Sequence, residues 1–228
     1  MIALGLLAGP TETALSVQLA GSGSSAVKIF LLFTALSFAS ALIVSLTSFT
    51  RIIIVLSFVR QGLGTQQLPP NQVLLGLALM LTGFVMAPTA TKVYDDALNP
   101  YLENQIDQSA AIDKATAPML DFMLRQTRST DLQLFYEASG RPMPARGDVV
   151  PMTVAAPAFM ISELTTAFRM GLFVYLPLLL IDILVGALLM ALGMMMVPPT
   201  LVSLPLKIGV FLLADGWHLL AGSLLRSF

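Results

Sequence analysis

The sequence contains no cysteine and only one histidine among its 228 residues. The absence of cysteine excludes disulfide bonds, thiolate chemistry and cysteine metal sites. His218 alone cannot form a histidine-based metal cluster, and beside Trp217 in an apolar segment we assign it a structural role. The sequence also lacks the GxSxG and HExxH arrangements of hydrolases. We therefore expect no catalytic residue, no metal site and no cofactor.

Charged residues are scarce as well. They make up 11% of the chain, whereas soluble domains carry about 25%. The formal net charge of −1 gives no reason to expect nucleic acid as a partner. Apolar residues make up 56% of the chain, which is typical of membrane proteins. The composition therefore predicts an all-α, membrane-associated protein.

The apolar residues gather in four runs, which we group into two helical hairpins. Residues 29–88 are the first apolar hairpin and residues 156–228 are the second. Within the first, Val73–Ala87 is short for a span of about 20 residues, and Pro88 is expected to end it. Residues 1–28 precede both hairpins and lack a basic segment ahead of Ile2–Ala8. They are either the remnant of a signal peptide or a flexible N-terminal arm.

The segment 89–155 differs in character, because nine of the chain's acidic residues lie in it. Its charge pattern predicts two amphipathic helices, Tyr94–Gln108 and Ala117–Glu137, with Pro118 in the first turn of the second. Phe122 and Phe135 stand among charged neighbours. They either fill a small local core or form a contact between subunits.

Two arginines of the first hairpin have no acidic residue nearby in the sequence. Arg51 and Arg60 fall in a helical pattern, and the charges that neighbour the loop Gln61–Gln72 are positive only. The positive-inside rule places this loop in the cytoplasm, and with four spans the segment 89–155 and both termini would lie outside. The arginines are either interfacial anchors or contacts for phosphate or a partner protein.

Isolated charges also occur in the second hairpin, where they are costly unless paired or hydrated. Glu163 and Lys207 are one candidate pair. Lys207 and Asp215 are another, although eight positions are too many for a simple contact along one helix. The short second run, these charges and the recurring prolines favour hairpins buried in a protein assembly over clean membrane spans.

The segment Gly193–Pro199 (GMMMVPP) separates the two runs of the second hairpin. Pro198 and Pro199 lack a backbone N–H, and Gly193 adds backbone freedom, so we predict a break between two helices. The three methionines either fill an apolar hairpin tip or, with copies from other subunits, form a ring of flexible thioethers that closes an opening.

Three long motifs resemble a known family, in the same order as in that family. They are LTSFTRIIIVLSFVR at residues 46–60, FMISELTTAF at 159–168, and GMMMVPP at 193–199, followed by Leu204–Lys207 and Asp215–Trp217. Together they resemble the FliP family, the P subunits of the flagellar protein-export gate. The SctR subunits of type III secretion injectisomes are related. The intact methionine triplet and the length of the acidic segment fit the flagellar branch better than the injectisome alternative.

The resemblance implies a subunit of a channel rather than an enzyme. In this family a pentamer of P subunits joins the Q and R subunits in a helical pore complex on the periplasmic side of the inner membrane, within the flagellar basal body. Its further partners are the B and A subunits of the export apparatus, the MS ring and rod proteins, and the unfolded export substrates.

The resemblance also implies roles for single residues. Met194, Met195 and Met196 match a methionine gate around the channel. Glu163 and Lys207 match a charged pair that bridges adjacent subunits, and Phe122 and Phe135 match phenylalanines in subunit contacts. A competing hypothesis is a solute transporter or proton pathway, whose relay groups would be Glu163, Asp182 and Asp215. The sequence shows no internal symmetry of the kind that transporters have.

Overall fold

The computed structural model describes residues 27–34, 36–37, 44–65, 68–142, 150–194 and 196–228, and all regular secondary structure in them is helical. The chain divides into two units, Met1–Ile43 and Val44–Phe228. In the first unit, the described residues form helix and most of their side chains are exposed. All but the last two residues of the predicted N-terminal arm, 1–28, lie outside the described residues.

The second unit begins with a hairpin of α2 (Phe49–Gly62) and α3 (Asn71–Val93). Helix α3 starts directly after Pro70, whose fixed φ suits the entry to a helix. The prediction that Pro88 ends the second apolar run is wrong. Helix α3 passes through Pro88 and continues through a π-helix, η1 (Tyr94–Leu98), into α4 (Asn99–Leu102). Pro88 removes one backbone donor, but the helix continues on both sides of it.

The acidic middle segment folds as two helices whose bounds differ from the predicted ones. Helix α5 (Gln108–Gln126) is capped at its N-terminus by Asp107, whose carboxylate accepts from the Ala110 N–H at 3.1 Å. Helix α6 (Ser129–Ala138) follows after two extended residues. The predicted helix Tyr94–Gln108 is thus replaced by η1 and α4. Pro118 lies in the interior of α5, not in a first turn.

A single helix, α7 (Met152–Ala191), dominates the C-terminal half. Its 40 residues correspond to a length of about 60 Å. It contains Pro157 and Pro177, so neither proline divides it. After the methionine segment come α8 (Thr200–Leu213) and α9 (Gly216–Arg226), which meet at a bend of 63°. Asp215 forms the bend with a positive φ of 50°.

Two helical segments are long and apolar enough to cross a membrane, namely Asn71–Leu102 and Met152–Ala191. A third span results if the bent pair of α8 and α9 counts as one. The fold class predicted from the sequence, an all-α chain with membrane-associated apolar helices and a mixed-charge helical middle segment, is confirmed for the described residues. The four-part division at residues 28, 88 and 155 stays a prediction, and the boundary at 88 falls within α3.

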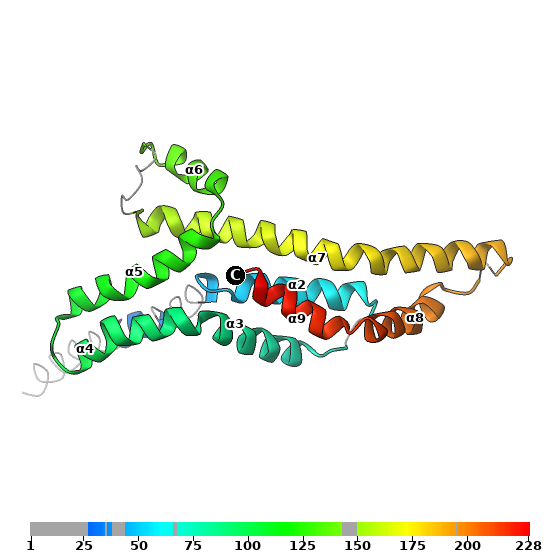
Figure 1. Cartoon of the computed structure of the whole chain (residues 1–228), viewed down its shortest axis with the longest axis horizontal. Helices are drawn as coiled ribbons and strands as arrows, with labels where there is room; N and C mark the ends of the chain where they lie inside the picture. Colours follow the sequence, from blue (N-terminus) through cyan, green and yellow to red (C-terminus); the bar gives the residue numbers. More distant parts are fainter. Residues whose placement is uncertain (1–26, 35, 38–43, 66–67, 143–149, 195) are drawn as a thin grey trace, which may run out of the picture. The chain divides into compact units, whose positions relative to one another are not determined.

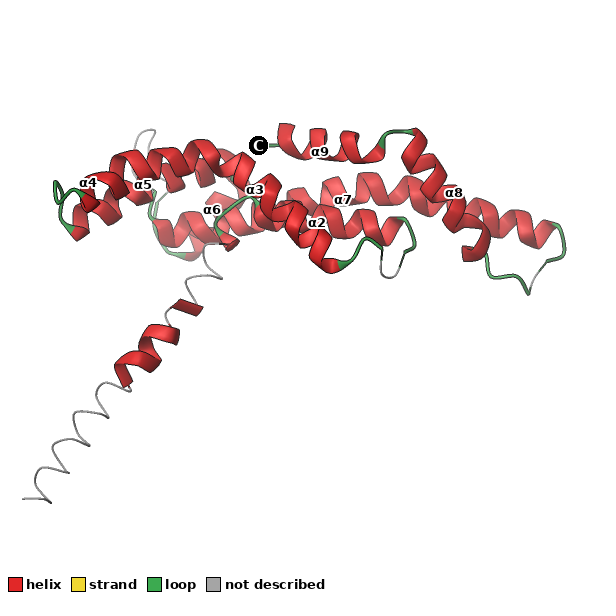
Figure 2. Cartoon of the chain, turned by 90° about the horizontal axis from the view of Figure 1, so that it is seen from below, coloured by secondary structure: helices red, strands yellow, loops and turns green. Residues whose placement is uncertain are grey.

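Helix α2 lies at the centre of the second unit and packs mainly against α7, with α3 and α9 beside it (Figures 1 and 2). Its buried face supplies Ile52, Val55, Leu56 and Val59. The contact with α7 is close because Gly171 has no side chain, and a Cβ atom there would lie 2.5 Å from the Phe58 ring. Small residues at such contacts are typical of packed membrane helices.

Candidate functional site

The methionine segment lies in a tight turn between α7 and α8. Gly193 has a φ of +76°, and its N–H donates to the Met190 carbonyl oxygen at 3.0 Å. The Met194 N–H donates to the Leu189 carbonyl oxygen at 2.9 Å. These two bonds form a Schellman motif, which satisfies the last carbonyl groups of α7. The sequence Gly-Met therefore ends the 40-residue helix with a fixed geometry.

The turn presents its methionines outward. Met194 is 46% exposed and Met196 is 97% exposed, while Met195 lies outside the described residues. Pro199 packs back toward α7, since its Cγ atom lies 3.7 Å from where a Cβ atom of Gly186 would be. The flexible, uncharged thioethers of Met194 and Met196 thus lie at the surface just after the end of α7, and in one chain they enclose nothing.

Close to the turn, a buried polar group joins three helices. Lys207 of α8 is 3% exposed, and its Nζ atom lies 2.5 Å from Asp182 Oδ2 in α7. The same Nζ donates to the carbonyl oxygen of Gly62, at the end of α2, at 2.9 Å. Ser203 Oγ donates to the other oxygen of Asp182 at 2.6 Å. We call Asp182, Ser203, Lys207 and the Gly62 carbonyl the Lys207 network.

A second buried ion pair lies at the other end of α2. Arg51 is 2% exposed and Glu163 is 0% exposed. Arg51 Nε donates to Glu163 Oε2 at 2.9 Å, and a second nitrogen, Nη2, donates to Glu163 Oε1. This bidentate geometry is the strongest form of an arginine–carboxylate pair. The interpretation of Arg51 as an interfacial anchor is therefore wrong, because the side chain is buried within its own chain.

The remaining donors of Arg51 reach two segments that are distant in sequence, the end of α5 and the last residues after α9. Nη1 donates to the Ser227 carbonyl oxygen at 2.7 Å and to the Ser227 hydroxyl at 3.1 Å. Nη2 also donates to Gln126 Oε1 at 3.2 Å, and the guanidinium lies 3.9 Å from the centre of the Phe228 ring. All five N–H groups are satisfied, so the buried charge is compensated. Arg51, Gln126, Glu163, Ser227 and Phe228 form what we call the Arg51 hub.

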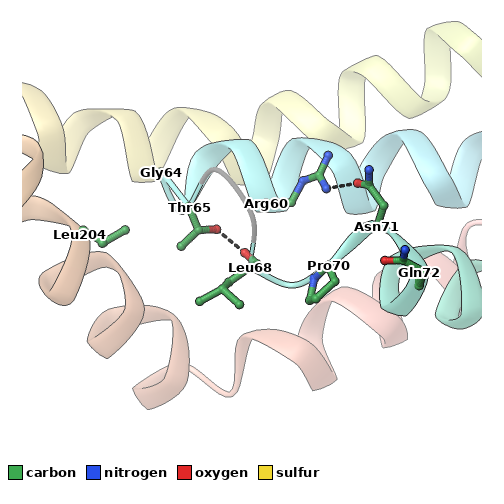
Figure 3. Close-up of a pocket in the computed structure, with 8 residues that line it drawn as sticks. All are labelled: Arg60, Gly64, Thr65, Leu68, Pro70, Asn71, Gln72 and Leu204. Atoms are coloured by element: carbon green, nitrogen blue, oxygen red, sulfur yellow. Dashed lines mark hydrogen bonds between the residues drawn. The ribbon is translucent and has the colours of Figure 1, made fainter.

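Arg60 differs from Arg51 in being only partly buried. Its guanidinium donates to Asn71 Oδ1 across the turn between α2 and α3 (Figure 3). A cavity of about 740 Å³ opens beside this turn and reaches Leu204 of α8. The two predictions for Arg60, an interfacial anchor or a contact for phosphate or a partner protein, both stay predictions. His218 is exposed on α9 and takes part in neither the Arg51 hub nor the Lys207 network.

Another polar cluster ties α6 to the first turns of α7. Arg128 donates to both oxygens of Asp131 at 2.8 Å, and Ser162 Oγ donates to Asp131 Oδ2 at 2.5 Å. Burial alone would raise the pKa of Asp131, but the hydrogen bonds from Arg128 and Ser162 outweigh burial and lower that pKa below its usual value. Among the residues that the structure describes, no group of three acidic or histidine side chains could hold a metal ion.

Comparison with known proteins identifies the family. A model of the FliP family matches residues 32–224. A flagellar biosynthetic protein FliP of Pectobacterium carotovorum is 52% identical over 91% of this chain and 80% of its own length. The relative of the same name in Bacillus subtilis is 49% identical, with 90% and 93% covered. The chain belongs to the FliP family. The FliP relative of Caulobacter vibrioides matches 97% of this chain at 44% identity, which extends the likeness toward both ends.

Within this FliP-family chain, the residues predicted to pair have other partners. Glu163 pairs with Arg51 and Lys207 pairs with Asp182, so Glu163 and Lys207 are not a pair inside one chain. Asp215, the second candidate partner of Lys207, is exposed at the bend between α8 and α9. A contact of Glu163 with Lys207 between adjacent FliP subunits stays a prediction, and it would require both buried pairs to rearrange.

The two phenylalanines predicted at subunit contacts differ in burial. Phe122 is buried, with ring centres 5.9 Å from Phe159 and 6.4 Å from Phe228. It fills a local core of its own subunit and leaves little surface for another. Phe135 is only partly buried beside Tyr136 and Val150. Subunit contact by either residue stays a prediction, and the free surface is larger at Phe135.

Sequence reasoning missed most of the polar partners in this FliP-family chain. It did not assign Gln126 or Ser227 to Arg51, nor Asp182 and Ser203 to Lys207. The available signal was the number of isolated charges, because Arg51, Glu163, Asp182 and Lys207 are two cations and two anions in apolar runs. Such charges are expected to pair in a membrane protein. Which cation takes which anion depends on helix packing that the spacing does not define.

Proposed function

We propose that the chain is a subunit of the flagellar type III protein export gate. Membership of the FliP family supports this function, and the relatives named above are flagellar biosynthetic proteins. The role is structural, and we propose no catalytic residue, metal or cofactor. We prefer the flagellar function to the injectisome alternative because these relatives are flagellar proteins.

In the proposed assembly, five copies of this subunit join the Q and R subunits around a channel for unfolded flagellar proteins. The B and A export subunits and the MS ring and rod proteins surround it. Two apolar segments long enough to span a bilayer support a location in the inner membrane. We place the assembled gate on its periplasmic side, in the flagellar basal body. The many exposed apolar side chains of α7 and α8 would then be covered by lipid or by neighbouring subunits.

The observation that carries the proposed gate is the exposure of Met194 and Met196 directly after the Schellman motif that ends α7. Met195 completes the triplet in the sequence. A ring of such turns would close a channel with flexible side chains, which can seal against ions and still yield to varied polypeptides. One subunit alone would form no barrier.

The gate is tested by replacing Met194, Met195 and Met196 with alanine in the chromosomal gene. We expect the complex to assemble and the membrane to leak ions, measured as a loss of membrane potential in growing cells. A matched control replaces Met190, which is 65% exposed on the same helix end but lies outside the triplet. An unchanged membrane potential in a fully assembled triple variant would exclude the gate.

The proposed bridge between subunits is tested by charge exchange at Glu163. Glu163→Lys alone is expected to destabilise the folded subunit, because it places two cations together in the Arg51 hub. Adding Arg51→Glu should restore the folded subunit if the pair acts within one chain. Adding Lys207→Glu should restore the oligomer, measured by native mass spectrometry, only if the pair acts between chains.

A further inference from the structure

Helix α8 is held to the rest of the chain in an unusual way. Only two of its 14 residues are buried, and these are Ser203 and Lys207. Most of its large apolar side chains are exposed instead, including Leu201 at 68%, Leu206 at 49% and Leu212 at 63%. The fully buried residues that attach α8 to the other helices are thus the polar members of the Lys207 network, while Phe211 is only partly buried against the apolar core around α2.

Lipid around α8 would strengthen this attachment relative to apolar contacts, and α8 and α9 together are apolar enough to form one bent span. Lipid tails are as apolar as leucine, so an exposed leucine of α8 gains little by packing on α7. An unpaired lysine or aspartate in the same setting is costly. The contacts of Lys207 with Asp182 and with the Gly62 carbonyl therefore mainly determine the position of α8.

The geometry of the Lys207 network suits this role. Lys207 Nζ joins a carboxylate of α7 to the last carbonyl of α2, and a cation at a helix C-terminus also interacts favourably with the helix dipole. Gly64 covers the same nitrogen, since a Cβ atom there would lie 3.6 Å from Nζ. One amino group thus fixes α8 against two helices at once.

This network is close to the methionine turn along the chain. Asp182 lies nine residues before the end of α7 at Ala191, and Lys207 lies seven residues after the start of α8 at Thr200. These separations correspond to about 10–14 Å along each helix. Any rotation of α8 about the network would therefore displace the turn.

We propose that the Lys207 network is a latch that holds α8 on α7 and α2 and so sets the position of Met194 and Met196. Lys207 and Asp182 are positioning residues, because they act on the channel only through the turn. The consequence for ion flow rests on the proposed gate, whereas the latch itself is a property of one chain. The latch and a bridge from Lys207 to Glu163 of an adjacent subunit exclude each other, because both use the same amino group.

The latch is tested by distance measurement between two spin labels. Gln61 in α2 and Leu206 in α8 are both exposed, and the absence of native cysteine allows both to be replaced by labelled cysteine. Labelled full-length chains are diluted with unlabelled ones so that only distances within a chain are recorded. In the parent chain we expect one narrow distribution of distances between the two labels. In Lys207→Gln we expect this distribution to broaden and shift. Asp215→Asn, which removes an exposed acid outside the network, should keep the narrow distance.

A second label pair, Gln61 with Arg169 of α7, reports on the rest of the fold. It should stay narrow in Lys207→Gln. If it broadens as well, the network stabilises the whole fold and the latch is overturned. If neither pair changes, the latch is also overturned, because α8 is then held by other contacts.

Membrane potential in cells making Lys207→Gln separates the latch from the gate. Ion leakage together with a lost α8 distance supports both. A lost α8 distance with normal membrane potential supports the latch and contradicts the gate role of the methionines.

Discussion

The Arg51 hub and the Lys207 network both bury an ion pair, but they differ in their surroundings. Glu163 is inaccessible, and the hub lies beside the apolar core around α2. At the network, the Asp182 side chain is 33% exposed and α8 contributes no buried apolar residue. The free energy of a buried charge depends on whether water can replace a lost partner. We therefore infer that the hub stabilises the fold, whereas the network determines the position of one helix.

The largest effect is expected from Glu163→Gln. The Arg51 charge would stay buried without its carboxylate, and the free energy of unfolding should fall by about 3–5 kcal/mol. Thermal unfolding in detergent, followed by circular dichroism, measures the loss. Replacing both Arg51 and Glu163 with methionine should cost less than the sum of the single changes. Equal losses of unfolding free energy for Glu163→Gln and for Lys207→Met would contradict the distinction between the Arg51 hub and the Lys207 network.

The next effect concerns the helix contact between these two sites. Gly171→Ala would place a Cβ atom 2.5 Å from the Phe58 ring, and we expect a loss of about 1–3 kcal/mol from overpacking. Gly186→Ala is the matched control nearer the methionine turn, where the nearest side-chain atom lies at 3.7 Å. The control should be neutral or slightly stabilising, because alanine favours helix. A neutral Gly171→Ala would show that α2 and α7 are loosely packed.

Lys207→Met should affect global stability less than Glu163→Gln does. The partly exposed Asp182 can take water in place of the lysine, so we expect a loss of about 1–2 kcal/mol in the same thermal assay. The exchange variant, Asp182→Lys with Lys207→Asp, sharpens the test. It restores opposite charges but turns a carboxylate toward the Gly62 carbonyl, so full recovery of stability would contradict a role for that hydrogen bond.

The smallest effect is a pH dependence at Asp131. Its lowered pKa means that the folded state favours the charged form, so its contribution is complete above the unfolded pKa of about 3.9 and is lost as pH falls through the folded value. Asp131→Asn should cost about 1 kcal/mol at neutral pH. The difference from the parent chain should vanish in acid. A difference that persists at low pH would assign the effect to packing and not to charge.

The sequence predicted the helical class and the break at the methionines, because apolar runs and the Gly-Met-Met-Met-Val-Pro-Pro pattern are local signals. It did not predict that α3 crosses Pro88 or that α7 crosses Pro157 and Pro177, because each proline removes only one backbone donor and each of these helices continues past it. The pairing of Arg51 with Glu163 spans 112 positions and depends on how α2 lies on α7. No local pattern contains that information.

The Arg51 hub also has a consequence for how the subunit is made. Arg51 and Ser227 are 176 positions apart, so the ribosome has still to add most of the chain after the arginine has been synthesised. During that interval its guanidinium lacks the Ser227 carbonyl and the Phe228 ring, and contacts between distant positions form slowly. Glu163 too is added late. The nascent subunit therefore carries a charged, incompletely bonded α2 until Ser227 and Phe228 have been synthesised.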